Sequence, residues 1–381
     1  MAKWNQRIIR IFVCSIIFLL SLSSCRQGSP IRVGLVAQFS GQQADLGIHM
    51  RNGVELAIEE INAAGGINGR QIELIVEDDF GTPQGAMDAE NKVIDEGIVA
   101  VIGHITSDQT LTGYDVAAQR EVLMFSATAA TAEMTGIDDL FYRTAPSTDA
   151  MGHIFASYVY DDRKIKKVAI IFDENNRSFT ETWANAFSET FIKSGGIITL
   201  TEKIYSSKPD DYSKSVARIK DTSAEAVLII ASPYDTALIA QTISLQNWSP
   251  ILFTTSWAQG DMLLQTGGKT VEGIELIAFF NVNDTTPELI KFKSDYKEHF
   301  GTDPIFTAMQ GYETMQLLAE ALQKTNGRAE NLGNELLSIQ DYVGLTGPVK
   351  LDSAGDVVRN LVVQKIIDGK FETVKKLEMA E

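Results

Sequence analysis

Short apolar segments that alternate with amphipathic segments constrain the fold of this chain more than any other feature. The alternation runs from residue 31 to residue 126 and begins again near residue 165. The apolar segments lie at residues 31–39, 71–76, 99–102, 122–126, 168–172, 197–203, 226–231 and 251–255. Short apolar strands that alternate with helices are typical of parallel sheets covered on both faces. The sequence therefore predicts an α/β protein with two doubly wound lobes.

The segments between these strands carry apolar residues at helical spacing. They lie at 50–61, 83–96, 179–192, 212–219 and 236–246, with a further helix from about residue 109. Towards the end of the chain we expect helices at 287–300, 307–324 and 333–339, and β segments at 349–351 and 361–367. Ligands of open α/β sheets bind beyond the carboxyl ends of the strands, so two facing lobes would form a cleft.

The start of the chain predicts export. Basic residues precede an apolar run of twelve residues, 11–22, which is shorter than the roughly 20 residues that span a bilayer. The following Leu22-Ser23-Ser24-Cys25 resembles the bacterial lipobox, whose cysteine becomes lipidated and N-terminal. We expect residues 1–24 to be a lipoprotein signal peptide, Cys25 to be the lipidation site and 25–30 to be a tether. The alternative is a plain signal peptide or an anchor helix with an incidental cysteine.

Length, charge and cysteine count narrow the class of protein. A chain of 381 residues exceeds the usual size of a single core, in agreement with two lobes. The 33 basic and 50 acidic residues give a formal net charge of −17, which argues against a nucleic-acid partner. The two cysteines are Cys14, inside the signal segment, and Cys25, so no disulfide or cysteine-zinc site is expected. The four histidines are widely spaced and are expected at the surface or a cleft wall, and we expect neither metal nor cofactor.

Sequence motifs give only weak support for an enzyme. The chain has no Gly-x-Gly-x-x-Gly turn and no Gly-x-Ser-x-Gly elbow. Gly268-Lys269-Thr270 looks like the end of a P-loop, but Leu263 stands where the first glycine belongs. The Asp78-Asp79 pair is more typical of a capped strand end than of acid–base catalysis. We therefore expect a binding protein, with an exported enzyme as the weak alternative.

Several short segments together resemble the type I periplasmic binding proteins, in particular the branch that binds leucine, isoleucine and valine. The segments are the Ser40-Gly41 turn, 57–62 followed by Gly65-Gly66-Ile67-Asn68-Gly69, Glu77-Asp78-Asp79, Gly103-His104, 126–135 and 141–144. The similarity runs from residue 31 to about residue 369. It implies two Rossmann-like lobes joined by three crossover strands, near 143–144, 275–279 and 347–350. Lobe one would comprise 31–144 with 278–346, and lobe two 145–277 with 347–381.

The resemblance also implies a function. The family delivers a small ligand to a membrane ABC permease by hinge closure, in agreement with a lipid anchor at the membrane. We expect a monomer whose ligand is first of all an amino acid, branched-chain or related. Aromatic or other carboxylic acids and amides are the alternatives. A lipoprotein that presents its ligand to a membrane receptor is the rival role.

Two loops are candidates for the ligand carboxylate. Thr106 and Ser107 lie between strand 99–102 and the next helix, where hydroxyl and backbone N–H donors suit an anion. By resemblance, Ser107 aligns with the carboxylate-binding serine, although serine often only caps a helix there. In the second loop, Thr128 matches a backbone-carbonyl position of the family. Ala130 replaces the family's threonine, and Thr131 comes one residue late, where a turn or capping role is the alternative.

The ammonium of an amino acid needs an acid, and here the sequence departs from the family. Trp257 stands near the position where amino-acid binders commonly carry that acid. Asp235 and Asp173 could replace it, although for either residue taken singly a helix N-cap is the more common role. Since a buried ammonium without an acid is costly, either one carboxylate faces the ligand or the ligand lacks an ammonium.

Aromatic residues are expected to form an apolar wall. Trp257, Phe179 and Tyr234 follow strand ends of the second lobe, and a tryptophan there offers stacking area and one N–H donor. The alternative for Trp257 is a core residue near the hinge. Leu46 is expected near the cleft rim of the first lobe. Arg177 is more typical of a solvated loop than of a carboxylate ligand.

Overall fold

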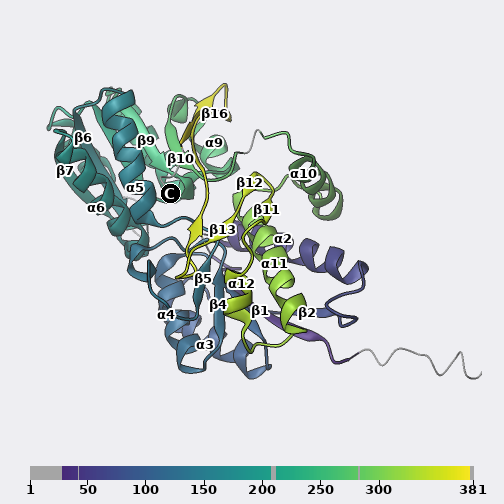
Figure 1. Ribbon diagram of the computed structural model, residues 1–381. Helices are drawn as coiled ribbons and strands as arrows, with labels where there is room; N and C mark the ends of the chain where they lie inside the picture. The colour runs from purple at the N-terminus through teal and green to yellow at the C-terminus, as the bar shows by residue number, and fades with distance from the viewer. Residues whose placement is uncertain (1–27, 42, 207–211, 282–283, 378–381) are drawn as a thin grey trace, which may run out of the picture.

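The computed structural model describes residues 28–41, 43–206, 212–281 and 284–377. The predicted signal peptide and the predicted lipidation site, Cys25, lie outside these residues. Figure 1 shows two α/β lobes, one around β1–β5 and one around β6, β7, β9 and β10. Within the described residues, no helix has both the length and the apolar character needed to cross a membrane.

The first lobe contains a five-stranded sheet in the order β2-β1-β3-β4-β5, with all strands parallel. The strands are β1 (Ile31–Ala37), β2 (Ile72–Asp78), β3 (Ala100–Gly103), β4 (Leu123–Ser126) and β5 (Phe141–Arg143). Side chains of β1 alternate between two buried clusters, with Val33 and Leu35 in one and Val36 in the other. Burial on both faces explains why this segment reads as one continuous apolar run.

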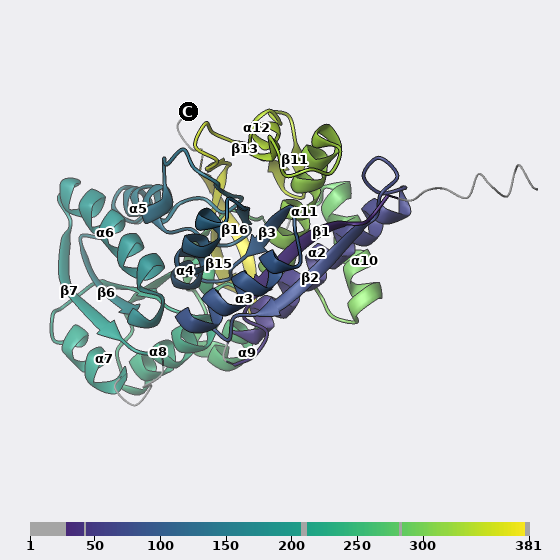
Figure 2. The ribbon, with the colours of Figure 1, turned by 90° about the horizontal axis from the view of Figure 1, so that it is seen from below.

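The described part of the chain contributes six helices to this lobe. They are α2 (Ala44–Ala63), α3 (Pro83–Asp95), α4 (Ser107–Gln119), α10 (Pro287–Phe300), α11 (Phe306–Thr325) and α12 (Leu332–Leu337). Helices α2 and α11 are far apart in sequence but lie side by side (Figures 1 and 2). Glycine permits this approach, because a Cβ at Gly53 would lie 2.0 Å from the carbonyl oxygen of Ala308.

The second lobe contains a seven-stranded sheet in the order β16-β15-β10-β9-β8-β6-β7. Its strands are β6 (Lys167–Asp173), β7 (Ile197–Ile204), β8 (Ala226–Ile230), β9 (Ile251–Thr255), β10 (Glu275–Ala278), β15 (Leu361–Ile367) and β16 (Lys370–Leu377). Strands β6 to β10 are parallel, whereas β15 and β16 pair antiparallel at one edge. The helices are α5 (Thr148–Ser157), α6 (Arg177–Lys193), α7 (Tyr212–Lys220), α8 (Pro233–Leu245) and α9 (Asp261–Gly267).

The chain passes between the two sheets after β5, after β10 and before β15. Strand β10, near the second predicted crossover, is a full member of the second sheet, and the passage follows it. The third passage contains two small antiparallel pairs, β11 (Val343–Gly344) with β12 (Gly347–Pro348), and β13 (Lys350–Leu351) with β14 (Val357–Val358). Short helical turns are η1 (Ala132–Met134), η2 (Tyr158–Asp162), η3 (Glu174–Asn176), η5 (Ser256–Ala258) and η6 (Gly268–Val271).

Candidate ligand-binding site

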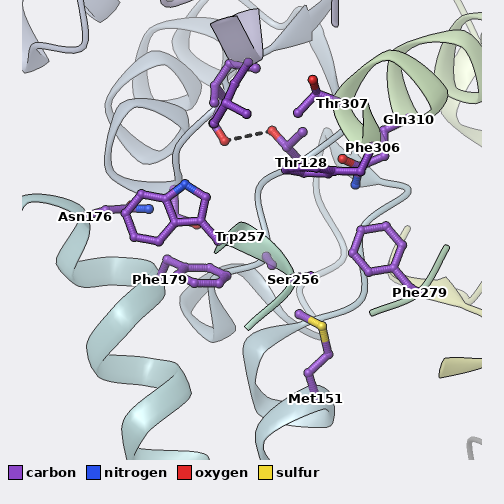
Figure 3. Close-up of a pocket in the computed structure, with 14 residues that line it drawn as sticks. Thr128, Met151, Asn176, Phe179, Ser256, Trp257, Phe279, Phe306, Thr307 and Gln310 are labelled. Carbon is purple, nitrogen blue, oxygen red and sulfur yellow. Dashed lines mark hydrogen bonds between the residues drawn. The ribbon is translucent and has the colours of Figure 1, made fainter. Parts of the chain in front are cut away.

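A cavity lies between the two lobes, and it is lined by loops that follow the carboxyl ends of strands and by the first turns of helices (Figure 3). Its space between atoms is about 450 Å³, part of it open to solvent. The first lobe contributes Leu46, Ile105, Ser107, Thr128, Ala130, Phe306, Thr307 and Gln310, and the second contributes Met151, Asn176, Phe179, Ser256 and Trp257, with Phe279 from the passage after β10. This position beyond the strand ends is where open α/β sheets bind ligands.

Among the predicted site residues, Ser107 has the hydroxyl that is most clearly available to bind a ligand. It is the first residue of α4, its side chain is buried, and its Oγ has no hydrogen-bond partner among the described residues. The hydroxyl of Thr128 is already engaged, because its Oγ1 donates towards the carbonyl oxygens of Ile105 at 2.8 Å and His104 at 2.9 Å. At this loop, a ligand anion would therefore meet Ser107 and the N-terminus of α4.

The sequence pattern did not predict a second group of polar side chains that lines the cavity. Thr307 and Gln310 lie at the start of α11, are 0% and 1% exposed, and line the cavity. Thr307 Oγ1 and both side-chain polar atoms of Gln310 have no hydrogen-bond partner in the described part of the chain. The sequence did contain a signal for this group. Thr307 and Gln310 are polar residues three positions apart in a helical segment that otherwise carries the apolar Phe306 and Met309.

Aromatic side chains form the opposite side of the cavity. Figure 3 shows Phe179 and Trp257 together, away from Thr307 and Gln310. Their rings pack edge to face, with centroids 5.6 Å apart and an interplanar angle of 72°. Met151 and Phe279 add apolar surface. Trp257 and Phe179, both expected on an apolar wall, therefore line the cavity, whereas Tyr234 is 40% exposed and lines a separate surface hollow beside Leu46 and Met262.

Neither candidate acid lines the cavity. The Asp235 carboxylate accepts hydrogen bonds from the hydroxyls of Tyr212, at 2.6 Å, and Ser232, at 2.5 Å, and burial raises its pKa. The Asp173 carboxylate accepts hydrogen bonds from the backbone N–H groups of Asn175 and Ser206, and burial raises its pKa as well. Among the described residues, no aspartate or glutamate lines this cavity. Asp173 caps η3, which is the alternative stated for it, whereas Asp235 is the third residue of α8 and the N-cap of that helix is Ser232.

Three other candidates also lie outside the cavity lining. The Thr106 hydroxyl donates to Gln109 Oε1. Thr131 is fully buried, and its Oγ1 accepts the backbone N–H of Glu133 and so caps η1. Arg177 pairs with Glu181 at 2.6 Å on the surface. Thr131 and Arg177 therefore follow the alternatives stated for them, a capping residue and a solvated arginine.

The two lobes are joined directly beside the cavity. The carboxylate of Asp108, on α4 of the first lobe, accepts the backbone N–H groups of Arg177 at 3.1 Å and Ser178 at 2.9 Å, at the start of α6 in the second lobe. Asn176 Oδ1 in turn accepts the N–H of Asp108 at 3.5 Å. An acid at a helix N-terminus is stabilising, so Asp108 holds the lobes together in this arrangement.

A buried histidine supports the ligand-facing loop from behind. His104 Nδ1 lies 2.7 Å from Asp79 Oδ2, and its Nε2 lies 3.4 Å from Glu90 Oε2. Burial would lower the pKa of His104, but the interactions with Asp79 and Glu90 outweigh burial and raise it to about 9. The expectation that each histidine lies at the surface or a cleft wall is wrong for His104, which is fully buried because two carboxylates compensate its charge. It is also wrong for His49, which is buried against the hydroxyl of Tyr296.

Known proteins resemble this chain over most of its length. The family model described as periplasmic binding protein matches residues 30–370. The Leu/Ile/Val-binding protein BraC3 of Rhizobium johnstonii is 34% identical over 201 residues, 52% of this chain and 54% of the relative, so that match spans about half of each protein. The leucine-, isoleucine-, valine-, threonine-, and alanine-binding protein of Pseudomonas aeruginosa is 24% identical over 361 residues, 94% of this chain and 95% of the relative.

Solved structures show the same fold. The leucine-binding protein LivK from Thermotoga maritima has a TM-score of 0.83 at 21% identity, and the match covers 91% of this chain and 99% of that one. A solute-binding protein of an ABC transporter from R. palustris, solved with benzoate, also has a TM-score of 0.83, at 19% identity and with coverage of 91% and 96%. The two lobes, the cavity between them and the family match lead to one conclusion: the chain belongs to the periplasmic binding protein family.

Proposed function

We propose that this protein is an exported, lipid-anchored solute-binding protein that closes over a small carboxylate with an apolar body and delivers it to an ABC permease. The observation that carries the proposal is the cavity between the lobes, where Ser107 presents a buried hydroxyl that has no partner in the described part of the chain, opposite an apolar wall. The hydroxyl and the N-terminus of α4 suit a carboxylate, and the aromatic wall suits an apolar body. Lobe one would comprise 31–144 with 278–346, and lobe two 145–277 with 347–381.

Two ligand classes fit this description. Branched-chain amino acids come first by relationship, since the relatives are named for leucine, isoleucine and valine. Carboxylic acids without an amino group are the second class. They are favoured by the lack of an acid among the described residues that line the cavity, and a similarly folded protein was solved with benzoate.

Hinge closure would couple binding to delivery. The ligand would bind first to Ser107 on lobe one, and Phe179 and Trp257 of lobe two would then close over it. Asp108 would favour the closed form, because its bonds to the start of α6 need the lobes to meet. A ligand shifts such an equilibrium only through contacts that differ between the open and closed forms.

A thermal-shift panel of purified protein without residues 1–24 tests the proposal. The panel compares amino acids with matched carboxylic acids. A ligand present at 100 times its Kd adds about 2.7 kcal/mol to the free energy of unfolding. Stabilisation by one class, weakened by Ser107→Ala, would support the proposal, and no stabilisation by either class would refute it. Stimulation of ATPase activity in a reconstituted permease would distinguish delivery from the receptor role.

The anchor needs a separate test. Expression of the full chain should give a membrane-bound form whose N-terminal peptide begins at Cys25 and carries the mass of the lipid. Cys25→Ser should release the protein from the membrane fraction. A membrane-bound Cys25→Ser variant would argue for the plain anchor helix instead.

A further inference from the structure

The polar groups at the start of α11 narrow the chemistry of the ligand, and this inference rests on the proposed function. Thr307 is the second residue of α11, and Gln310 lies one turn into this helix of 20 residues. Both side chains line the cavity, and Figure 3 shows them on the side away from Trp257 and Phe179. Three of their polar atoms, Thr307 Oγ1, Gln310 Oε1 and Gln310 Nε2, have no partner among the described residues.

Buried polar atoms without partners are costly, at about 1–3 kcal/mol each. Proteins therefore seldom keep three of them at one place unless a ligand or ordered water completes them. Gln310 offers both a donor and an acceptor from its amide, and the Thr307 hydroxyl can act as either. Together they match a group that both donates and accepts, such as a hydroxyl or an amide.

The electrostatics of the cavity disfavour a cation at this place. The N-termini of α4 and α11, at Ser107 and Phe306, both face the cavity, and a helix N-terminus carries a partial positive charge. Asp108, the acid next to Ser107, is engaged with the backbone N–H groups of α6. Since the described cavity lining includes no aspartate or glutamate, an ammonium would be buried there without a counter-charge.

We propose that Thr307 and Gln310 form a subsite for an uncharged polar group, so that the ligand is a carboxylate with a hydroxyl or amide in place of the ammonium of an amino acid. Ser107 and the start of α4 bind the carboxylate. Thr307 and Gln310 bind the uncharged group. Trp257 and Phe179 cover the apolar body.

Isothermal titration with matched ligand sets tests this assignment. One set is leucine, 2-hydroxy-4-methylpentanoate and 4-methylpentanoate, which differ only in the group on the α carbon. The other is benzoate and 4-hydroxybenzoate, which places a hydroxyl far from the carboxylate. We expect a hydroxylated acid to bind at least tenfold tighter than the unsubstituted acid of its set, and leucine to bind weaker than the hydroxylated acids.

Two substitutions at one position make the test specific. Gln310→Met keeps the size of the side chain but removes the amide, and it should reduce the preference for the hydroxylated acid to less than threefold. Gln310→Glu introduces an acid and should shift the preference towards leucine by at least tenfold. Gln323→Met, at an exposed position of the same helix, is the matched control and should leave all affinities unchanged.

The outcomes separate the two proposals. Tightest binding of leucine to the unchanged protein, or a preference for the hydroxylated acid that survives Gln310→Met, would overturn the subsite and leave the carboxylate-binding function standing. Ser107→Ala should weaken the whole set alike, because every member has the carboxylate. If no member of either set binds, the proposed function fails and the subsite fails with it.

Discussion

The two walls of the cavity differ in chemistry. The first-lobe wall contains buried polar atoms that lack partners in the described structure, on Ser107, Thr307 and Gln310. The second-lobe wall presents mainly the apolar surface of Met151, Phe179 and Trp257, to which the Trp257 indole adds one N–H donor. The difference assigns separate tasks. The first lobe selects the polar groups of the ligand, and the second contributes apolar area and closure. Substitutions on the two walls should therefore have effects of different kind and size.

The largest expected effect is a loss of stability when the buried network of His104, Asp79 and Glu90 next to the polar wall is broken. His104→Gln leaves Asp79 and Glu90 buried without their cation, and breaking such a buried pair costs about 3–5 kcal/mol. The Thr128 hydroxyl bonds the carbonyl oxygen of residue 104, so the ligand loop should loosen as well. Urea unfolding measures the loss of stability. An unchanged unfolding midpoint would show that the polar wall does not depend on this network.

The same histidine predicts a pH dependence. Its pKa is about 9 in the folded protein and near 6.5 when unfolded, so its stabilisation is fully present below about pH 6.5. That stabilisation declines as the pH rises from 6.5 through 9. The free energy of unfolding of the unchanged protein should fall over this window, and His104→Gln should remove that part of the fall. Parallel pH profiles for the two proteins would contradict the assignment.

The next effect concerns the carboxylate. Ser107→Ala should weaken ligand binding about 10- to 100-fold, because a hydrogen bond to a charged group contributes about 1.5–3 kcal/mol. Stability should change little, and circular dichroism with titration calorimetry checks both quantities. Ser256→Ala, on the opposite wall, is the matched control and should cost less affinity. A larger loss from Ser256→Ala would reverse the comparison between the two walls.

Substitution of Asp108, the residue that joins the lobes, should weaken closure. Asp108→Ala removes two bonds to the start of α6, and loss of such a cap costs about 0.5–2 kcal/mol. Affinity should fall several-fold, and small-angle X-ray scattering should detect a larger open fraction at equal ligand concentration. Asp115→Ala, at an exposed position of the same helix, should have no such effect. Equal scattering curves for the two variants would leave Asp108 without a role in closure.

A smaller effect is expected on the apolar wall. Trp257→Leu leaves a smaller apolar side chain and removes the edge-to-face contact with Phe179, and aromatic pairs add about 0.5–1.5 kcal/mol beyond the area they bury. Affinity should fall about two- to tenfold, and more for an aromatic ligand than for an aliphatic one. An equal loss for both ligand types would mean that the wall acts through area alone.

The smallest effect is expected at Asp235. Asp235→Asn should leave affinity within about twofold, because the carboxylate serves Tyr212 and Ser232 rather than the cavity. Calorimetry with leucine is the sharpest readout. A tenfold loss of leucine affinity would make Asp235 the partner of an ammonium and would place an acid on the second-lobe wall.

Much of this protein could be predicted from its sequence. Strands β1, β3, β6 and β8 are short and apolar on both faces, so local pattern alone reveals a covered parallel sheet. The same pattern locates loops at strand ends, and together with the family resemblance it points to Ser107, Thr128 and Trp257, which all line the cavity. Local periodicity did not anticipate α9 or the antiparallel edge strand β16, which have weaker patterns.

The direction of single side chains was decided only by the tertiary structure. Asp235 and Asp173 follow strand ends as the sequence indicated, yet Tyr212, Ser232 and nearby backbone N–H groups hold them away from the cavity. Gln310 reaches the cavity because α11, from the far end of the chain, packs against α2. Apolar periodicity is a local property, so it can be recognised from the sequence alone. Which buried polar atom finds a partner depends on segments distant in the chain, and folding alone brings them together.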